Sequence, residues 1–146
     1  MKTDFLLDVN VLVAMAWPTH RSHEDVQEWL SLHARDTWAT CPLTQTAFVR
    51  ILSNPAFSPN AQTPLDALTL LRANLSHPAH RFWGDELSLI QALERLTPQL
   101  AGHQQVTDAY LLGLAVHKKG KLATMDRGIL TLLPKKIPAR EFVELI

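Results

Sequence analysis

Short apolar runs alternate with longer segments in which apolar residues recur every three or four positions. The short runs predict buried strands, and the longer segments predict amphipathic helices. The expected strands are residues 5–9, 37–41, 82–83, 122–125 and 142–146. The expected helices are residues 11–17, 22–35, 44–53, 64–75, 87–96, 109–118 and 129–133.

Short polar residues and prolines mark where these helices should begin and end. Serine, threonine and asparagine side chains can accept a hydrogen bond from the free N–H groups of a first helical turn. Proline suits the first helical position, and glycine often follows the last one. The predicted N-caps are Asn10, Ser22, Thr44 and Thr63, the last followed by Pro64, and Gly120 is predicted to end helix 109–118.

The alternation of strands and helices predicts an α/β fold. The connections between strands are long enough for parallel pairing, so we expect a three-layer α/β/α sandwich around a central, mostly parallel sheet. We find no linker or internal repeat, and residues 1–146 are expected to form a single domain. Ligands of such sheets bind at the carboxyl ends of the strands, which directs attention to polar residues there.

Composition excludes several classes of protein. With 47% apolar residues and only five glycines, the chain is neither disordered nor collagen-like. Lysine plus arginine and aspartate plus glutamate both number 14, so any binding of nucleic acid must come from a local site. No apolar run approaches the roughly 18 residues of a membrane helix. We therefore expect a cytoplasmic protein without a membrane partner.

The N-terminus and the single cysteine agree with that expectation. Lys2, Asp4 and Asp8 interrupt the early apolar run, which therefore lacks the features of a signal peptide. Cys41 has no second cysteine with which to form an intramolecular disulfide, and its apolar setting indicates a buried strand residue.

Three aspartates far apart in the sequence are predicted at the same edge of the sheet. Asp8 and Asp126 each follow an apolar strand, and Asp108 begins an apolar helix. Two carboxylates about 4 Å apart repel each other by roughly 4 kcal/mol at an effective dielectric of 20. Mg²⁺ or Mn²⁺ would relieve this repulsion, because both are hard cations that prefer carboxylate oxygen. The sequence therefore predicts a divalent-cation site.

Each acid also has an ordinary structural alternative. Asp108 can cap its helix, and Asp126 can stabilise a turn beside Gly128. For Asp8 the better cap is Asn10, which leaves the Asp8 carboxylate free. A zinc site is not favoured, because His20 and His23 are three residues apart and no HExxH pattern exists.

Five segments carry a resemblance that covers nearly the whole chain. They are LLDVNVLVAMAW with Asp8, TQTAFVRILSNP with Gln45 and Arg50, RFWGDELSL with Asp85, GHQQVTDAYLLGLA with Asp108, and KLATMD with Asp126. In this order they resemble the successive blocks of VapC-like toxins of the PIN-domain family. The resemblance implies a compact α/β/α fold and an Mg²⁺- or Mn²⁺-dependent endoribonuclease that acts on RNA. It also implies a homodimer and a small DNA-binding antitoxin encoded next door.

The resemblance also implies roles for particular residues. Asp8, Asp108 and Asp126 match the first, third and fourth acids of the family. Asn10 matches the small polar residue two positions after the first acid, and Thr124 matches the polar residue that precedes the last.

The chain departs from the family at the second acid. Gln45 stands where the family often has glutamate, which lowers the negative charge of the site by one. Its amide oxygen can still accept a hydrogen bond from water or contact the metal. Asp85 can supply a compensating carboxylate or can cap the helix that follows it.

These matches lead us to expect different roles for the acidic, amide and basic residues. Asp8 and Asp108 hold the cation, while Asp126 and Gln45 orient the waters around it. Arg50 and Arg127 are candidates for contact with phosphate. A basic cluster can do the same or can simply place favourable charge at a helix C-terminus. That cluster comprises His117, Lys118, Lys119 and Lys121.

Two other functions remain open at the level of sequence. A phosphatase of the haloacid dehalogenase type also has an aspartate after an apolar strand, but it needs a second aspartate two residues on, where this chain has Asn10. A non-catalytic PIN-like module that binds RNA or protein is the other alternative, and the neutral Gln45 is the residue that favours it.

Overall fold

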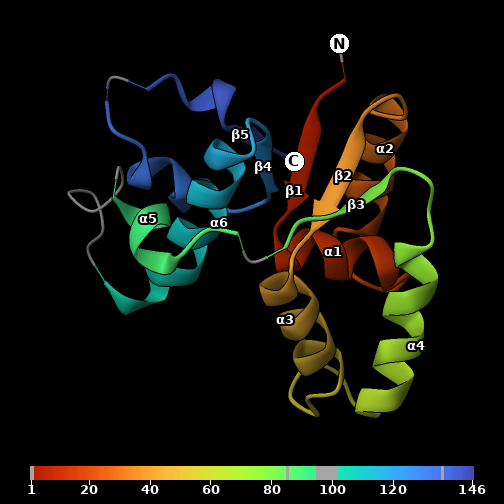
Figure 1. Cartoon of the computed structure of the whole chain (residues 1–146). Coiled ribbons are helices and arrows are strands. Elements are labelled where there is room, and N and C mark those ends of the chain that lie inside the picture. Colours follow the sequence, from red (N-terminus) through yellow and green to blue (C-terminus); the bar gives the residue numbers. More distant parts are fainter. Residues whose placement is uncertain (1, 85, 95–101, 136) are drawn as a thin grey trace.

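The computed structural model of the chain describes residues 2–84, 86–94, 102–135 and 137–146 (Figure 1). The strands are β1 (Asp4–Leu7), β2 (Thr37–Thr40), β3 (His80–Phe82), β4 (Lys121–Thr124) and β5 (Val143–Leu145). The α-helices are α1 (Val9–Ala16), α2 (His23–Leu32), α3 (Pro42–Leu52), α4 (Pro64–Leu75), α5 (Leu89–Leu93) and α6 (Val106–His117). Short 3₁₀ turns occur at His103–Gln105, Arg127–Leu132 and Ala139–Glu141.

The five described strands form one parallel sheet in the order β3-β2-β1-β4-β5. The first strand is central, since Leu6 of β1 lies between Ala39 of β2 and Leu122 of β4. Parallel pairing throughout means that all five strands end at the same edge of the sheet. The predicted three-layer α/β/α fold with a central parallel sheet is confirmed.

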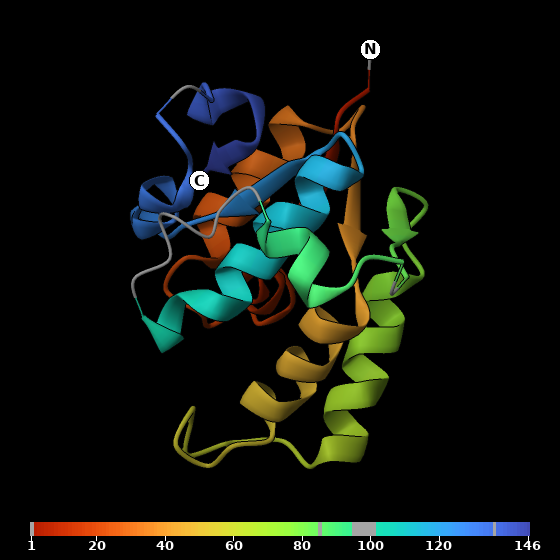
Figure 2. The same cartoon turned by 60° about the vertical axis from the view of Figure 1, so that its left-hand side comes forward.

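Two apolar clusters cover the two faces of the sheet. Successive strand side chains point to opposite faces, so Phe5 and Leu7 join the cluster formed with α1 to α4, whereas Leu6 joins the cluster formed with α6. Figures 1 and 2 show α2 and α6 on opposite sides of the sheet. This burial on both faces explains why the strands read as continuous apolar runs.

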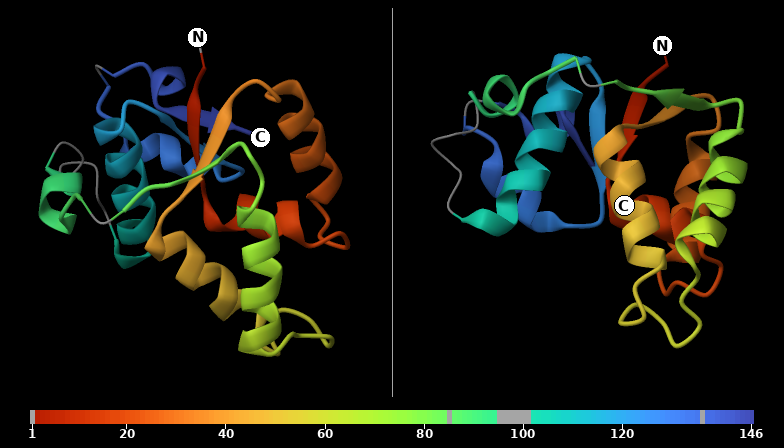
Figure 3. Two further views of the ribbon diagram at one scale, coloured as in Figure 1. Left: turned by 45° about the vertical axis from the view of Figure 1, so that its right-hand side comes forward. Right: turned by 60° about the horizontal axis from the view of Figure 1, so that its bottom comes forward.

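Helices α3 and α4 form a hairpin at the carboxyl edge of the sheet. They pack side by side, and Figure 3 shows them reaching past the ends of the strands. Phe48 of α3 and Leu71 of α4 anchor the hairpin in the cluster that also contains Val13 of α1. The α3–α4 hairpin therefore borders the region beyond the carboxyl ends of β1 and β2 on one side.

The N-cap residues of α1 and α3 differ from those expected. Asp8, not Asn10, is the N-cap of α1, because the helix already begins at Val9 and its first N–H reaches the Asp8 carboxylate. Cys41 takes the cap position of α3, and Thr44 instead lies in the first turn, where its hydroxyl accepts a hydrogen bond from the Cys41 N–H.

Ser22 and Thr63 are at the predicted N-cap positions, but only Thr63 makes a capping hydrogen bond among the described residues. Ser22 is at the N-cap position of α2, but its side chain makes no capping hydrogen bond within the described part of the chain. Thr63 caps α4 as predicted, since its hydroxyl accepts from the Asp66 N–H at 3.1 Å, and Pro64 follows at the first helical position.

Gly120 has a different role from the predicted helix cap. The residue with positive φ after α6 is Lys119, at 59°, and the Gly120 N–H then donates to the Ala115 carbonyl at 2.9 Å. A Cβ atom on Gly120 would lie 2.5 Å from the carbonyl oxygen of Asp4. Glycine is therefore needed for the close approach of β4 to β1, not for its backbone angle.

The helix expected at residues 87–96 is shorter where it is described. Helix α5 spans Leu89–Leu93 and begins with a capping box in which Ser88 and Gln91 exchange hydrogen bonds. Positions 95 and 96 of the expected helix lie outside the described residues. None of the described helices is both long and apolar enough to span a membrane.

Candidate functional site

The three predicted aspartates approach one another at the carboxyl edge of the sheet. Asp8 follows β1 directly, Asp126 comes two residues after β4, and Asp108 lies in the first turn of α6. Strands β1 and β4 are neighbours, so the first two carboxylates are brought together by strand pairing. Helix α6 packs against both strands and adds the third.

Asp8 is held rigidly. Its side chain is only 6% exposed. One carboxylate oxygen, Oδ1, accepts from the Val9 N–H at 2.7 Å, and the other, Oδ2, accepts from the Thr124 hydroxyl at 2.8 Å. Each carboxylate oxygen has a second lone pair, so both retain the capacity to bind a cation or water.

Thr124 connects Asp8 with Asp126. Its buried hydroxyl donates to Asp8 and accepts from the Asp126 backbone N–H at 3.1 Å. Asp126 in turn accepts from the Gly128 N–H at 2.8 Å through Oδ1, which is the turn contact considered for it. Its second oxygen, Oδ2, is not used by that turn. Thr124 thereby fixes the spacing of the two acids.

Asp108 does not cap its helix. Gln105 is at the N-cap position of α6, and no described residue donates a hydrogen bond to the Asp108 carboxylate. Burial, followed by the negative charges of Asp8 and Asp126, raises the pKa of Asp108 to about 6. Asp108 is therefore not a helix cap. Its environment is instead set by burial and by the like charges of Asp8 and Asp126.

The pKa of Asp8 is also raised. Burial is the largest cause, and the charge of Asp126 acts in the same direction. The hydrogen bonds from Thr124 and Val9 oppose it, because they stabilise the ionised carboxylate. A site that is negative, half-desolvated and pre-arranged in this way favours a positive ligand.

A surface pocket of about 370 Å³ opens beside Asp8 and Asp126, and Asp108 is not among the residues that line it. Asp8, Asn10 and Asp126 contribute to it, and so does the loop between α1 and α2. Sequence reasoning missed that loop, although its consecutive polar residues after Pro18 were a signal. The loop residues that line the pocket are His20, Arg21 and Ser22, and Met125 completes the lining.

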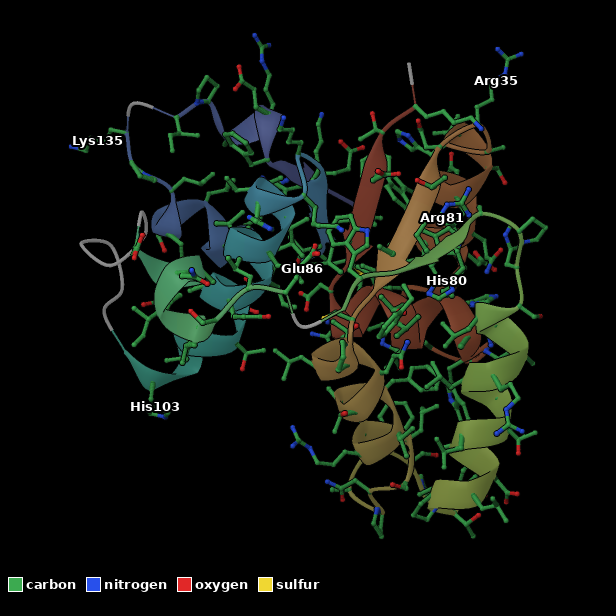
Figure 4. All side chains as sticks on the ribbon, in the orientation of Figure 1. Arg35, His80, Arg81, Glu86, His103 and Lys135 are labelled. Atoms are coloured by element: carbon green, nitrogen blue, oxygen red, sulfur yellow. The ribbon has the colours of Figure 1, made fainter. Side chains whose placement is uncertain are left out.

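Gln45 lies in a separate hydrogen-bond network. Its side-chain amide donates to the Thr40 hydroxyl at 2.9 Å, and that hydroxyl is 2.7 Å from Nε2 of His80. Figure 4 shows His80 on β3, next to Arg81. A water-orienting role for Gln45 stays a prediction, and its amide nitrogen is used by β2 in this arrangement.

The predicted basic residues do not line the acid pocket. Arg50 lies in the last turn of α3 and lines a groove between α3 and α4. Arg127 is exposed directly after Asp126. Lys118 forms an ion pair with Glu86 at 2.7 Å, which ties the basic cluster to the segment before α5. Asp85, the possible compensating acid, lies outside the described residues.

The acid set suits a divalent cation in charge and in donor type. Asp8, Asp108 and Asp126 carry carboxylate oxygens, and burial together with the charge of neighbouring acids raises the pKa of Asp8 and Asp108. Within the described residues, however, no three histidine, cysteine or acidic side chains come close enough to enclose an ion by themselves. Mg²⁺ commonly keeps several waters, so one or two carboxylates can bind it directly while the others act through water.

Comparisons with known proteins agree on one family. A family model described as the PIN domain matches residues 5–132. Ribonuclease VapC38 of Mycobacterium tuberculosis (strain H37Rv) is 43% identical over 131 residues, which cover 90% of this chain and 91% of that protein. Ribonuclease VapC39 of the same species (strain CDC 1551) is 38% identical over 124 residues, which cover 85% of this chain and 89% of that protein.

A solved structure shares the fold. It is the crystal structure of VapBC2 from Rickettsia felis bound to a DNA fragment from their promoter. The TM-score is 0.65, the identity is 15%, and the match covers 98% of both chains. At this identity the likeness concerns the fold alone, and it agrees with the parallel sheet described above.

Proposed function

The chain belongs to the PIN-domain family, and on this premise we propose that it is a metal-dependent endoribonuclease that hydrolyses phosphodiester bonds in RNA. We further propose that it is the toxin of a toxin–antitoxin pair, as the ribonuclease VapC relatives suggest. Its cofactor would be Mg²⁺ or Mn²⁺.

The observation that carries this proposal is that three carboxylates lie close enough for the charges of two of them to act on the third. Asp8 and Asp126 both act on Asp108, whose pKa of about 6 reflects burial and their charge. Proteins seldom keep like charges together without a counter-ion, because the repulsion costs stability. Asp8, Asp108 and Asp126 are the residues that would hold the cation. A bound divalent cation would supply Lewis-acid polarisation of the scissile phosphate and a more acidic water.

The residues of the chain prepare this chemistry. Thr124 donates to Asp8, which favours the ionised form of that carboxylate. Asp126, whose Oδ1 accepts from the Gly128 N–H, would accept a proton or orient a water through Oδ2. Asn10, exposed at the mouth of the pocket, can orient a second water.

The first test is cleavage of RNA by the purified protein. We expect cleavage of a structured RNA with Mg²⁺ or Mn²⁺ and none after addition of EDTA, with activity restored by excess cation. Equal cleavage in chelator would contradict the metal dependence. RNA binding without cleavage under any cation would favour the non-catalytic module instead.

The proposed partners are an antitoxin and a second copy of the chain. The Rickettsia felis structure holds VapBC2 on promoter DNA, which supports a small DNA-binding antitoxin encoded beside this gene. Expression of the chain alone should arrest growth, and co-expression with the product of the adjacent reading frame should relieve it. Sedimentation of the purified protein tests the homodimer. A monomeric sedimentation coefficient over the assay range would contradict that part.

Replacement of Thr124 by valine should weaken the site without removing an acid. Valine cannot donate to Asp8 or accept from the Asp126 N–H, so both carboxylates lose their fixed relation. Loss of a hydrogen-bond partner of a metal-binding residue typically lowers metal affinity or activity by about 10–100-fold. We expect kcat/KM to fall by roughly that factor, with a higher Mg²⁺ concentration needed for half-maximal rate.

Thr69→Val is the matched control. Its hydroxyl donates to the Leu65 carbonyl on the exposed side of α4, far along the chain from the acids. It should cleave RNA like the wild type. Unchanged cleavage and unchanged Mg²⁺ dependence in Thr124→Val would show that the threonine does not organise the site.

A further inference from the structure

The acid pocket has a second wall made by the loop between α1 and α2. Asp8, Asn10 and Asp126 line the pocket from the strand ends and the start of α1, and His20, Arg21 and Ser22 line it from the loop. The first wall carries carboxylates and the second carries donors. The pocket thus combines a place for a cation with groups that can face an anion.

The charges of the two walls act in opposite directions on an RNA substrate. The carboxylates of Asp8 and Asp126 repel the phosphates of an approaching strand. Arg21 is the one arginine or lysine among the described residues that line the pocket, and its side chain is exposed. A guanidinium there offsets the repulsion and can donate two hydrogen bonds to one phosphate.

The hydrogen bonds of His20 define which of its nitrogens can donate. Nδ1 accepts from the Ser22 backbone N–H at 3.0 Å, so the proton of the neutral ring is on Nε2. Burial, then the charges of Arg21 and His23, lower the pKa of His20, which keeps the ring in this neutral form near pH 7. His20 therefore offers the pocket a single donor of fixed position.

The loop is held in place before any ligand binds. The His20 N–H donates to the Trp17 carbonyl at 3.0 Å, and its own carbonyl accepts from the His23 N–H at 2.9 Å. The ring of His23 donates through Nδ1 to the Ala14 carbonyl at 2.6 Å, which ties the start of α2 to α1. The loop backbone and the His20 ring therefore have little freedom left to lose when a ligand binds this wall.

We propose that His20 and Arg21 bind the RNA backbone at the acid pocket, with His20 Nε2–H donating to a phosphate oxygen and Arg21 neutralising its charge. The inference rests on the proposed ribonuclease function and names the residues that receive its substrate. It places the phosphate contacts on the α1–α2 loop, whereas the sequence had suggested Arg50 and Arg127, which lie outside the pocket lining.

The test measures RNA binding separately from cleavage. A fluorescein-labelled single-stranded RNA of mixed sequence is titrated with protein in EDTA, and anisotropy gives Kd at several salt concentrations. Arg21→Ala should raise Kd about tenfold and lower the slope of log Kd against log salt by roughly 0.7, the value for one phosphate contact on a single strand.

Two substitutions of His20 separate binding from folding. Asparagine can still accept from the Ser22 N–H but has no donor at the position of Nε2, so His20→Asn should raise Kd about tenfold, as loss of a hydrogen bond to a charged group does. Glutamine carries an amide nitrogen near the position of Nε2, and His20→Gln should stay within about twofold of wild type. With Mg²⁺, His20→Asn and Arg21→Ala should raise KM more than they lower kcat.

Matched controls lie at the opposite end of the sheet. The Nδ1 atom of His77 accepts from the Ala79 N–H at 3.0 Å, the same local contact that His20 makes, and Arg35 is exposed just before β2 (Figure 4). His77→Asn and Arg35→Ala should leave Kd unchanged. Wild-type Kd in both loop variants, or an equal loss in the controls, would overturn the inference.

The remaining outcomes distinguish the inference from the function on which it rests. RNA binding that depends on His20 and Arg21, without cleavage by the wild type in Mg²⁺ or Mn²⁺, would overturn the nuclease and support the binding wall. Cleavage that depends on neither residue would support the nuclease and overturn the binding wall. A lower melting temperature in His20→Asn together with equal loss in His20→Gln would assign His20 a structural role instead.

Discussion

Replacement of Asp8 by asparagine is expected to reduce RNA cleavage by roughly a hundredfold to a thousandfold, the range seen when one electrostatic group of an active site is removed. Asp8 is the most buried of the three acids and the one in contact with both β4 and α1. The substitution removes one negative charge from the proposed cation site. Single-turnover cleavage at saturating Mg²⁺ measures the chemical step directly.

The fold should survive this change. The side-chain oxygen of asparagine can still accept from the Val9 N–H and cap α1, and the Thr124 hydroxyl can rotate to accept from the new amide. Circular dichroism and the melting temperature check this. Asp66→Asn, an exposed acid in the first turn of α4, is the control and should cleave normally. Wild-type cleavage by folded Asp8→Asn would remove Asp8 from the site.

The positions of the acids could be predicted because strand ends are easy to recognise. A buried parallel strand is a short apolar run, and its last residue fixes where the next polar side chain emerges. Leu7 and Thr124 end neighbouring strands, so Asp8 and Asp126 had to be near each other once the sheet was parallel. The fold class and the edge of the sheet therefore followed from pattern alone.

The hydrogen bonds of those acids could not be predicted in the same way. Asp8 and Asn10 are both good caps, and the choice depends on whether α1 begins at Val9 or two residues later. Glycine is a residue type expected at a helix cap, but Gly120 is required because its backbone approaches the carbonyl oxygen of Asp4, which is distant in sequence. Such choices are made by packing between elements, which a single sequence does not display.

The α1–α2 loop is the clearest example of this limit. His20 and Arg21 belong to no periodic pattern, and they acquire a role only because the loop folds back beside β1 and β4. Gln45 illustrates the reverse case. Its place near the start of α3 was predictable, but the contact of its partner Thr40 with His80 depends on the pairing of β2 with β3.

Replacement of Asp108 by asparagine is expected to have two opposite effects, a loss of cleavage as large as that of Asp8→Asn and a gain in stability. The cleavage loss follows because Asp108 is a proposed cation ligand. The stability gain follows because its pKa is raised to about 6 by burial and by the charges of Asp8 and Asp126. A carboxyl group with a raised pKa in the folded state stabilises the fold when protonated, and this contribution is lost as the pH rises through about 6.

The sign of the pH dependence is therefore fixed. Near pH 4, Asp108 is protonated in the folded protein, and the wild type and Asp108→Asn should differ little. At pH 7.5 without metal, the variant should be more stable by about 1 kcal/mol, a figure reduced from the full pKa shift because Asp108 is only half-buried. For a chain of this length that corresponds to a rise in melting temperature of roughly 2–4 °C.

Asp66→Asn separates this effect from that of the helix dipole. Both acids are the third residue of their helix, where a negative charge is favourable by a few tenths of a kcal/mol or more. Asp66 is exposed, so its replacement should lower the melting temperature slightly, whereas that of Asp108 should raise it. Mg²⁺ should then stabilise the wild type more than Asp108→Asn, because only the wild type has the full charge to neutralise. A melting temperature of Asp108→Asn that falls at pH 7.5 as it does for Asp66→Asn would mean that the three carboxylates do not repel one another, and the case for a cation between them would be lost.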